Sequence, residues 1–590
     1  MPRSSLLRFV GFAGAFALVG CGSRATATVD AGAAEAAWPG LTIDLTPDPA
    51  ASEVAVVLRL SGESAAKVTV LEVARLWADT RGASALLRVD ARDGDGDLAL
   101  RNGPEDGPDR TFLPARAPRG GELSVRYRVH ANGDTSRFGL HLSGERVSGV
   151  GHAFLLLPRI EAAIPVRIRW HLDALPAGAS AASSFGVGLV ETTVATSEEL
   201  GQAAYLAGVT HVEEPLPSLP SPVSDDAGAP IPGVASRLVV LGVPSFDTRA
   251  AFYWSVTALT TLDRFFENTA IPPGKAAYPF SFLLVAAPGL GADHDGAALT
   301  GSFALWFDQG RAFDAGLKSV VAHELTHRYV GGAVRLVDES GKEAVWFSEG
   351  FTVHLARRWL LESGMVTPRD VLGDLRRTMD DRASNERSAA CATSATGRSQ
   401  EEYRRGARYA ALTDVAIQKA SSGRRGIDDL VRELVVRGRA ERRGDLPLAA
   451  WRDAVQRELG DSGGASFDRI ILRGEPIEVP DRAFGPCFHR VARDEEVLDL
   501  GFDRRSLSTT PAVVSGVRAG SAAARAGLRD GALVLAAQVP GEGDPPKKNG
   551  KKAEVVLTLA GKGGGKKLRY RPWSKRRVVV WEAQECTKRR

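Results

Sequence analysis

The spacing of apolar residues changes along this chain, and that change restricts what the chain can fold into. In residues 53–60, 123–129 and 166–172, apolar and polar residues alternate, which is typical of strands with one buried face. From about residue 314 to 475, apolar residues instead recur every three to four positions, which predicts helices. At 590 residues, the chain also exceeds what one hydrophobic core organises. The sequence therefore predicts a multidomain α+β protein.

The first twenty residues differ from the rest. Arg3 and Arg8 give a basic start, and a mostly apolar run spans residues 9–19. At about 1.5 Å per residue, this run is too short to cross a hydrocarbon core of about 30 Å, so it predicts a secretory signal. Residues 18–21, Leu-Val-Gly-Cys, resemble the lipobox of bacterial lipoproteins. This resemblance implies lipidation of Cys21 and anchoring in the bacterial cell envelope, at the outer membrane where one exists, facing the periplasm or the surface. The alternative is an ordinary signal peptide with a chance cysteine.

Composition divides the chain further. A segment rich in Ala, Gly, Ser and Thr follows the cysteine, which is typical of a flexible tether. A proline-rich stretch separates the alternating part from the helical part and predicts a linker or loop. The expected division is a signal peptide at 1–20, a tether at 21–39, a sandwich-like β-rich domain at 40–212, a linker at 213–234, a mostly helical domain at 235–480 and a strand-rich domain at 490–590.

The helical domain is expected to open with a strand at 237–243, a helix at 248–267 capped by Asp247, and a strand at 280–287. Basic and acidic side chains nearly balance, with 75 Lys and Arg against 71 Asp and Glu. This balance argues against nucleic acid as the main partner. After export, Cys391, Cys487 and Cys586 can form one disulfide and leave one thiol, and the sequence leaves the pairing open.

The segment 319–327 reads Ser-Val-Val-Ala-His-Glu-Leu-Thr-His. On a helix, His323 and His327 project from the same face, so both imidazoles can bind one ion at about 2.0–2.1 Å. Glu324 lies next to the first ligand, within reach of a metal-bound water but badly placed to coordinate. This arrangement is typical of zinc-assisted hydrolysis with Glu324 as the general base. The alternative is a histidine pair with a purely structural role.

A candidate third ligand, Glu349, follows His327 by 22 residues. It belongs to the segment 345–352, which reads Val-Trp-Phe-Ser-Glu-Gly-Phe-Thr. An unpaired carboxylate in apolar surroundings is costly, and a bound metal removes that cost. Two imidazoles and one carboxylate also leave a fourth position open for water, as a catalytic site requires. The sequence therefore predicts one Zn²⁺ per chain, held by His323, His327 and Glu349.

These two segments resemble the gluzincin peptidases, and the order of domains resembles the glycyl aminopeptidase family. The resemblance implies a β-rich N-terminal domain, a thermolysin-like, mostly helical catalytic domain at 235–480 and a C-terminal PDZ domain at 490–590. Residues 403–407, Tyr-Arg-Arg-Gly-Ala, are similar to a Tyr-x-Lys-Gly stretch of this family and of aminopeptidase N relatives, where the tyrosine hydroxyl stabilises the oxyanion. By that resemblance Tyr403 is a catalytic residue, with Tyr409 as the alternative.

The chain also departs from the family pattern. Arg405 stands in place of the lysine of the Tyr-x-Lys-Gly stretch, and Thr300 stands where a Gly-Gly-Leu-Glu-His segment would supply an amine-binding glutamate. Asp293 or Asp295 is a possible substitute, and aminopeptidase specificity stays open. His354 replaces a tyrosine of the family and is expected to pack within its helix rather than bind metal.

Residues 498–502 and 514–531 carry the resemblance to a PDZ domain of the bacterial protease type. Such a domain binds an extended peptide, here a peptide C-terminus, by adding it as a strand to an open edge. Two functional hypotheses result. The first is a zinc-dependent peptidase that hydrolyses peptide bonds in peptides or proteins. The second is a catalytically inert, lipid-anchored adaptor that binds peptides through its PDZ domain.

Overall fold

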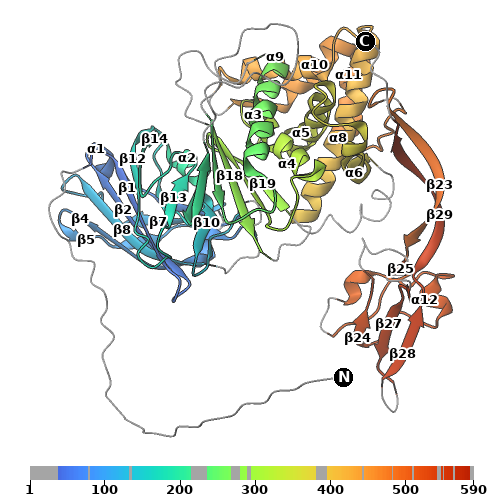
Figure 1. The fold of residues 1–590 in the computed structure, drawn as a ribbon, viewed down its shortest axis with the longest axis horizontal. Helices are drawn as coiled ribbons and strands as arrows, with labels where there is room; N and C mark the ends of the chain where they lie inside the picture. The colour runs from blue at the N-terminus through green and yellow to red at the C-terminus, as the bar shows by residue number, and fades with distance from the viewer. Residues whose placement is uncertain are drawn as a thin grey trace, which may run out of the picture.

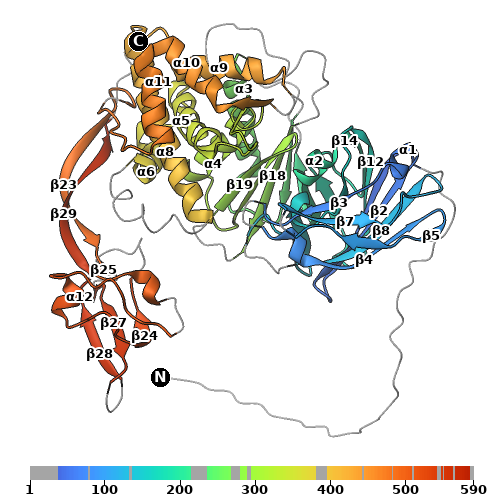
Figure 2. The same ribbon diagram turned by 180° about the vertical axis from the view of Figure 1, so that it is seen from behind.

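The computed structural model is a multidomain α+β protein, as the change in apolar spacing predicted (Figures 1 and 2). The expected signal peptide, Cys21, nearly all of the tether and the linker lie outside the residues that it describes. Among the described residues, no helix combines the length and the apolar content that a membrane crossing needs. The described residues are 38–77, 80–105, 107–131, 136–213, 236–267, 280–288, 294–379, 395–441, 444–481, 483–507, 511–540, 547–548, 551–561 and 565–584.

A seven-stranded sheet forms one layer of the N-terminal part. Along β2 and β8, buried residues alternate with more exposed ones, so the alternation in the sequence marks the face that meets the core. Strand β1 pairs in parallel with β12 and antiparallel with β2. In spatial order the strands are β14 (Val190–Ala195), β12 (Ile164–Trp170), β1 (Leu41–Asp48), β2 (Glu53–Ser61), β8 (Glu122–His130), β4 (Leu86–Asp93) and β5 (Gly96–Asp97).

Two four-stranded sheets complete the N-terminal part, and their inner residues share one core with the seven-stranded sheet. The first sheet contains β13 (Ser180–Ser183), β15 (Ala204–Gly208), β10 (Arg146–Val150) and β9 (His141–Leu142). The second contains β11 (Leu157–Pro158), β3 (Leu71–Ala74), β7 (Asp109–Pro114) and β6 (Leu100–Asn102). Between strands lie α1 (Glu63–Ala66) and α2 (Ser197–Gly201).

A five-stranded sheet joins the N-terminal part to the helices. Its order is β16 (Thr210–Glu213), β17 (Ser236–Leu241), β18 (Phe280–Ala287), β20 (Ser302–Asp308) and β19 (His294–Leu299). One face packs against helices through residues such as Phe282 and Leu284. The other packs against strands β10, β13 and β15 through residues such as Leu283 and Val285. Burial on both faces explains why the segment 280–287 is apolar without alternation.

The helices form the other layer of this part, beside the sheet (Figure 1). Helix α3 begins where Asp247 accepts a hydrogen bond of 3.0 Å from the Ala250 amide, as predicted. A short parallel pair, β21 (Arg335–Val337) and β22 (Asp445–Pro447), lies among the helices. The helices are α3 (Thr248–Phe265), α4 (Ala315–Thr326), α5 (Val345–Glu362), α6 (Pro368–Met379), α8 (Ala395–Ala420), α9 (Ile427–Gly438), α10 (Leu448–Leu459) and α11 (Asp461–Phe467).

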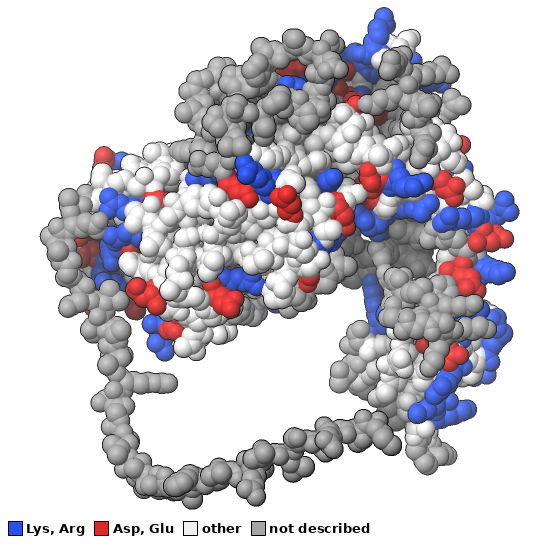
Figure 3. All heavy atoms as spheres, in the orientation of Figure 1, with Lys and Arg blue, Asp and Glu red and all other residues white. Residues whose placement is uncertain are grey.

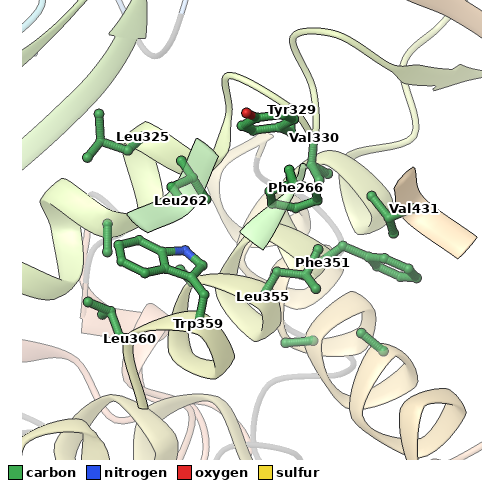
Figure 4. Close-up of a cluster of buried hydrophobic side chains, with 14 of the residues drawn as sticks. Leu262, Phe266, Leu325, Tyr329, Val330, Phe351, Leu355, Trp359, Leu360 and Val431 are labelled. Atoms are coloured by element: carbon green, nitrogen blue, oxygen red, sulfur yellow. The ribbon is translucent and has the colours of Figure 1, made fainter. Parts of the chain in front are cut away.

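The core between α3, α4 and α5 holds the helix of the candidate metal site in place (Figure 4). Leu325 of α4 and Leu355 and Trp359 of α5 are fully buried there. The Trp359 indole Nε1 donates a 3.0 Å hydrogen bond to Thr326 Oγ1 at the end of α4. These contacts fix α4 and α5 relative to one another, so side chains on their opposite faces have defined positions.

A two-stranded ribbon leads from the helices to a small C-terminal module. The ribbon pairs β23 (Phe488–Leu498) with β29 (Trp573–Ala583) along their whole lengths, and the module lies at its far end (Figures 1 and 2). At its root, Phe488 and Trp581 belong to the helical core. The module contains α12 (Ala522–Arg525), β24 (Val534–Gln538), β27 (Val555–Leu559) and β28 (Lys566–Tyr570), and the two-residue strands β25 (Lys547–Lys548) and β26 (Lys551–Lys552).

Two expectations from the sequence concern this C-terminal region, namely the pairing of the cysteines and the PDZ domain. Cys487 is disulfide-bonded, and each of the three other cysteines of the chain lies outside the described residues, so the choice among pairings stays open. Within the described part of the module, α12 is the only α-helix and it has four residues.

On the face in Figure 3, acidic and basic side chains are intermixed over the N-terminal and helical parts.

Candidate metal centre

Helix α4 carries the two candidate histidine ligands near its C-terminal end. Its first turn is capped by Asp314, whose carboxylate accepts a 3.0 Å hydrogen bond from the Leu317 amide. His323 and His327 lie one turn apart, and their Nε2 atoms are 3.1 Å from one another. The buried face of the same helix, which includes Val321 and Leu325, fixes the orientation of the histidines.

Helix α5 brings Glu349 to this pair. The Glu349 Oε2 atom lies 3.1 Å from Nε2 of His323 and 3.3 Å from Nε2 of His327. Ligands in a tetrahedral zinc site with bonds of about 2.0–2.1 Å are about 3.3 Å apart. The three atoms therefore have the mutual spacing that one zinc ion requires, and they are the three residues that the sequence selected.

The hydrogen bond of His327 shows which of its nitrogen atoms is available to a metal. Its Nδ1 lies 3.0 Å from the Val330 carbonyl oxygen, which can only accept, so Nδ1 carries the proton. The lone pair of Nε2 then points at the Nε2 of His323 and at the Glu349 carboxylate. Burial lowers the pKa of His327, but the Glu349 carboxylate outweighs burial and raises this pKa to about 10, so these atoms share a cation, either a proton or a metal ion. The donor set fits a metal ion.

Charge in the site also favours a metal-binding carboxylate. Burial alone would raise the pKa of Glu349, but the His327 and His323 imidazoles outweigh burial and hold this pKa well below its usual range. Glu349 is therefore ionised over the whole physiological pH range, as a metal ligand must be.

Glu324 lies beside the ligands in a tight, largely dry position. Its residue is 9% exposed, and burial raises the pKa of its carboxyl, with the Ala298 backbone amide acting in the opposite direction. A Cβ atom built on Gly296 of β19 would lie 2.7 Å from Glu324 Cγ and 2.8 Å from Val320 Cγ1. Gly296 thus lets strand β19 approach the candidate base, a role that the sequence analysis missed although the glycine interrupts a strand.

Two facing glycines bring Tyr403 to the site. Helix α8 crosses α5 where Gly406 meets Gly350, and a Cβ on Gly350 would lie 2.4 Å from Gly406 Cα. A Cβ on Gly406 would lie 1.8 Å from the Trp346 carbonyl oxygen. The helices therefore touch backbone to backbone, one residue after Glu349 on α5 and three residues after Tyr403 on α8.

The Tyr403 side chain faces two of the candidate ligands. Its ring lies parallel to that of His323, at an angle of 14° and with centroids 6.3 Å apart. Burial and the nearby Glu349 carboxylate raise the pKa of the Tyr403 hydroxyl well above its usual value. The hydroxyl consequently stays protonated at physiological pH and is able to donate a hydrogen bond.

The other residues that the family resemblance singled out, Tyr409, Arg405 and His354, lie outside the candidate metal site. Tyr409 is fully buried in the helical core and accepts a 3.2 Å hydrogen bond from Trp451 Nε1. Arg405 points away from the site and donates hydrogen bonds to the carbonyl oxygens of Ile470, Gly474 and Glu475. His354 is 3% exposed and lies 3.3 Å from Asp414 Oδ2, away from the ligands.

At the position of the missing glutamate, Thr300 bonds to the backbone of the N-terminal part. The Thr300 hydroxyl donates a 3.0 Å hydrogen bond to the Glu199 carbonyl oxygen. The Thr300 backbone amide donates a 2.9 Å hydrogen bond to the Gln202 carbonyl oxygen. The Asp295 carboxylate lines the cavity but forms an ion pair of 3.3 Å with Arg137. Asp293 lies outside the described residues.

A cavity of about 920 Å³ surrounds the candidate metal site. Most of its lining comes from helices α4, α5 and α6 and from strand β19, and the N-terminal part contributes Trp77, Phe138 and Gln202. Phe138 packs edge-on against both Trp77 and Trp306 of β20. No sequence pattern indicated these residues, because they reach the cavity through contact between domains.

The comparisons with known proteins agree with this geometry. A family model described as M61 glycyl aminopeptidase matches residues 317–414, a segment that contains both histidines, both glutamates and Tyr403. No curated protein matches the chain in sequence. An aminopeptidase N family protein from Idiomarina loihiensis has a similar structure, with a TM-score of 0.59 and 14% identity, over 92% of this chain and 98% of that one.

An M1 zinc metallopeptidase from Deinococcus radiodurans also matches, with 18% identity and a TM-score of 0.47, over 75% of this chain and 95% of that one. A mutant of that enzyme, bound to a Tyr-Ser-Ala substrate, matches with 17% identity, the same coverage and a TM-score of 0.47. At 14% identity the likeness to the Idiomarina loihiensis protein concerns the fold. The segment that holds the His-His-Glu group is similar to a peptidase family, and this match supports a peptidase.

Proposed function

We propose that this protein is a zinc-dependent peptidase of the gluzincin type. The observation that carries the proposal is the convergence of His323, His327 and Glu349 beside the buried carboxylate of Glu324. An inert site has no physical need for Glu324, because a carboxylate that is costly to bury stabilises nothing unless it reacts or binds.

Each residue has a chemical task in this proposal. When bound by His323, His327 and Glu349, zinc would polarise the scissile carbonyl and acidify water. Glu324 takes a proton from the attacking water and passes it to the leaving amine, and its raised pKa suits it to both steps. Tyr403 donates a hydrogen bond to the oxyanion that develops on the scissile carbonyl.

Strand β19 offers a surface for the substrate backbone. In the described residues it pairs with β20 and lies at the edge of its sheet, and its residues line the cavity. A peptide in extended form can add to such an edge through main-chain hydrogen bonds. Thr300 supplies no carboxylate for a free amino group, so we propose peptide-bond hydrolysis and leave the position of the cleaved bond within the substrate unassigned.

The lipid anchor at Cys21 and the PDZ assignment belong to the proposal on sequence grounds alone. By the lipobox resemblance, the catalytic domain would work at the bacterial cell envelope. The alternative function, an inert peptide-binding adaptor, is disfavoured by the presence of the buried Glu324 carboxylate beside the candidate ligands.

The decisive experiment compares the wild-type protein with Glu324→Gln on a mixed peptide library. We expect about one zinc per chain in both proteins, and hydrolysis lowered about 10²- to 10⁴-fold in the variant, because a general base contributes on that order. Glu339→Gln is the matched control, since Glu339 is exposed between the two motifs. Equal cleavage by wild type and Glu324→Gln would falsify the mechanism, and a purified wild type without zinc and without cleavage would favour the adaptor.

A further inference from the structure

Part of the cavity wall, here called the arm, comes from helices α5 and α6. Val353, Ala356 and Leu360 line it from α5, on the helix face that also carries Glu349. Val371 lines it from α6. These four side chains make the walls of the arm apolar.

The polar groups of this arm form one cluster. Arg357 donates from Nε and Nη2 to Asp374 Oδ2, at 2.8 and 2.5 Å, and from Nη2 to Thr378 Oγ1 at 2.8 Å. Arg377 Nη2 lies 3.0 Å from Asp374 Oδ1. Arg357, Asp374 and Arg377 all line the cavity. Two guanidinium groups face one carboxylate, so the cluster has a net charge of +1.

The buried guanidinium lacks one partner. The Arg357 side chain is 3% exposed, and its Nη1 has no hydrogen-bond partner in the part of the chain that the structure describes. This atom has almost no accessible surface, and the guanidinium lies over the Phe484 ring, with its Cζ 6.0 Å from the ring centroid. Arg357 therefore adds positive charge to the wall, while Arg377, whose side chain is 70% exposed, is the guanidinium that a ligand can contact. A carboxylate is the acceptor that a guanidinium binds best.

We propose that this arm binds a carboxylate of the substrate, so that the peptidase prefers peptides with an acidic group near the cleaved bond. The proposal rests on the proposed function. A wall that combines apolar side chains with a cationic cluster matches a glutamate side chain, with methylene groups before its carboxylate. The C-terminal carboxylate of a short peptide has the same chemistry and is the second possible source.

The test uses peptide pairs that differ only by Glu or Gln at one position, and reads kcat/KM. Arg377 is suited to charge reversal because its side chain is 70% exposed, so Arg377→Glu should fold. Arg369→Glu is the matched control, because Arg369 is exposed on the same helix and is not a lining residue. We expect the wild type and Arg369→Glu to prefer Glu over Gln about tenfold, and Arg377→Glu to lose that preference.

Two further measurements separate the alternatives. Amidation of the peptide C-terminus leaves the Glu over Gln preference unchanged if a side chain is bound. If the chain terminus is bound, Glu and Gln peptides are cleaved equally and amidation lowers kcat/KM for both. Binding of the same peptides to zinc-loaded Glu324→Gln, measured by fluorescence anisotropy, tests the arm without catalysis. If the wild type cleaves no peptide but binds Glu peptides more tightly than Arg377→Glu does, the proposed function fails and the binding site stands. Indifference to both the Glu or Gln exchange and amidation, a preference for Lys, or an unchanged preference in Arg377→Glu overturns the inference.

Discussion

At the scale of single residues, Tyr403 is the group whose role depends most on its surroundings. Its raised pKa keeps a proton on the hydroxyl, and its ring lies parallel to the His323 ring. We expect Tyr403→Phe to keep its zinc and its stability while kcat falls about 10²- to 10³-fold, since one oxyanion donor contributes about 3–4 kcal/mol.

Tyr409→Phe serves as the matched control for this prediction. It removes the hydrogen bond to the Trp451 indole in the helical core, so it should lower the free energy of unfolding by about 1 kcal/mol and leave kcat unchanged. Steady-state kinetics, zinc analysis and denaturant unfolding measure these effects. A Tyr403→Phe enzyme with wild-type kcat would remove Tyr403 from the mechanism.

The sequence could identify the metal-binding residues because their spacing is set by local geometry. Histidines four apart on a helix must share a face, and a glutamate in an apolar segment needs a partner. Gly296 and Phe138 could not be found in this way, because their positions beside the site arise from contacts between a strand and a helix and between two domains.

At the scale of secondary-structure elements, the crossing of α5 and α8 positions both Glu349 and Tyr403. A Cβ on Gly406 would meet the Trp346 carbonyl oxygen at 1.8 Å, so Gly406→Ala must push the helices apart. We expect a loss of about 1–3 kcal/mol in the free energy of unfolding. We also expect kcat to fall even when the variant is fully folded, because Tyr403 moves with α8.

Gly373→Ala is the control for this second prediction. Gly373 lies within α6 with nothing near its position for a Cβ, so alanine there should stabilise the helix by up to about 1 kcal/mol. Circular dichroism in denaturant and kcat at a temperature where each variant is fully folded provide the comparison. Unchanged stability and kcat in Gly406→Ala would show that the crossing tolerates a methyl group.

Elements with a clear local pattern, either periodic or continuously apolar, were predicted well. The strand expected at 280–287 is β18, and the helix expected at 248–267 is α3 (Thr248–Phe265). How these elements meet was not accessible in the same way. The edge position of β19 and the backbone contact of α5 with α8 depend on pairings across long sequence separations, for which a single sequence holds no periodic signal.

At the scale of the whole molecule, the candidate site is assembled where two domains meet. The five-stranded sheet is covered by helices on one face and by N-terminal strands on the other, and both sides contribute to the cavity. None of the described residues of the C-terminal module lines the cavity. The module connects through the β23–β29 ribbon, whose root packs into the helical core and accepts a 2.8 Å hydrogen bond from Arg376 Nε at the Trp581 carbonyl oxygen.

This arrangement allows the module to be removed without disturbing the site. Leu498 pairs directly with Trp573 at the far end of the ribbon, so residues 499–572 can be replaced by Asn-Gly, which closes a two-residue hairpin turn. We expect the shortened protein to hold about one zinc and to cleave short peptides with kcat/KM within about twofold of wild type. Cleavage of folded protein substrates should fall if the module captures their C-termini, because docking raises the local substrate concentration. The contradicting result is a shortened protein that keeps its zinc and its far-ultraviolet circular dichroism but cleaves no short peptide. The site would then depend on the module, although the two are separate in the structure.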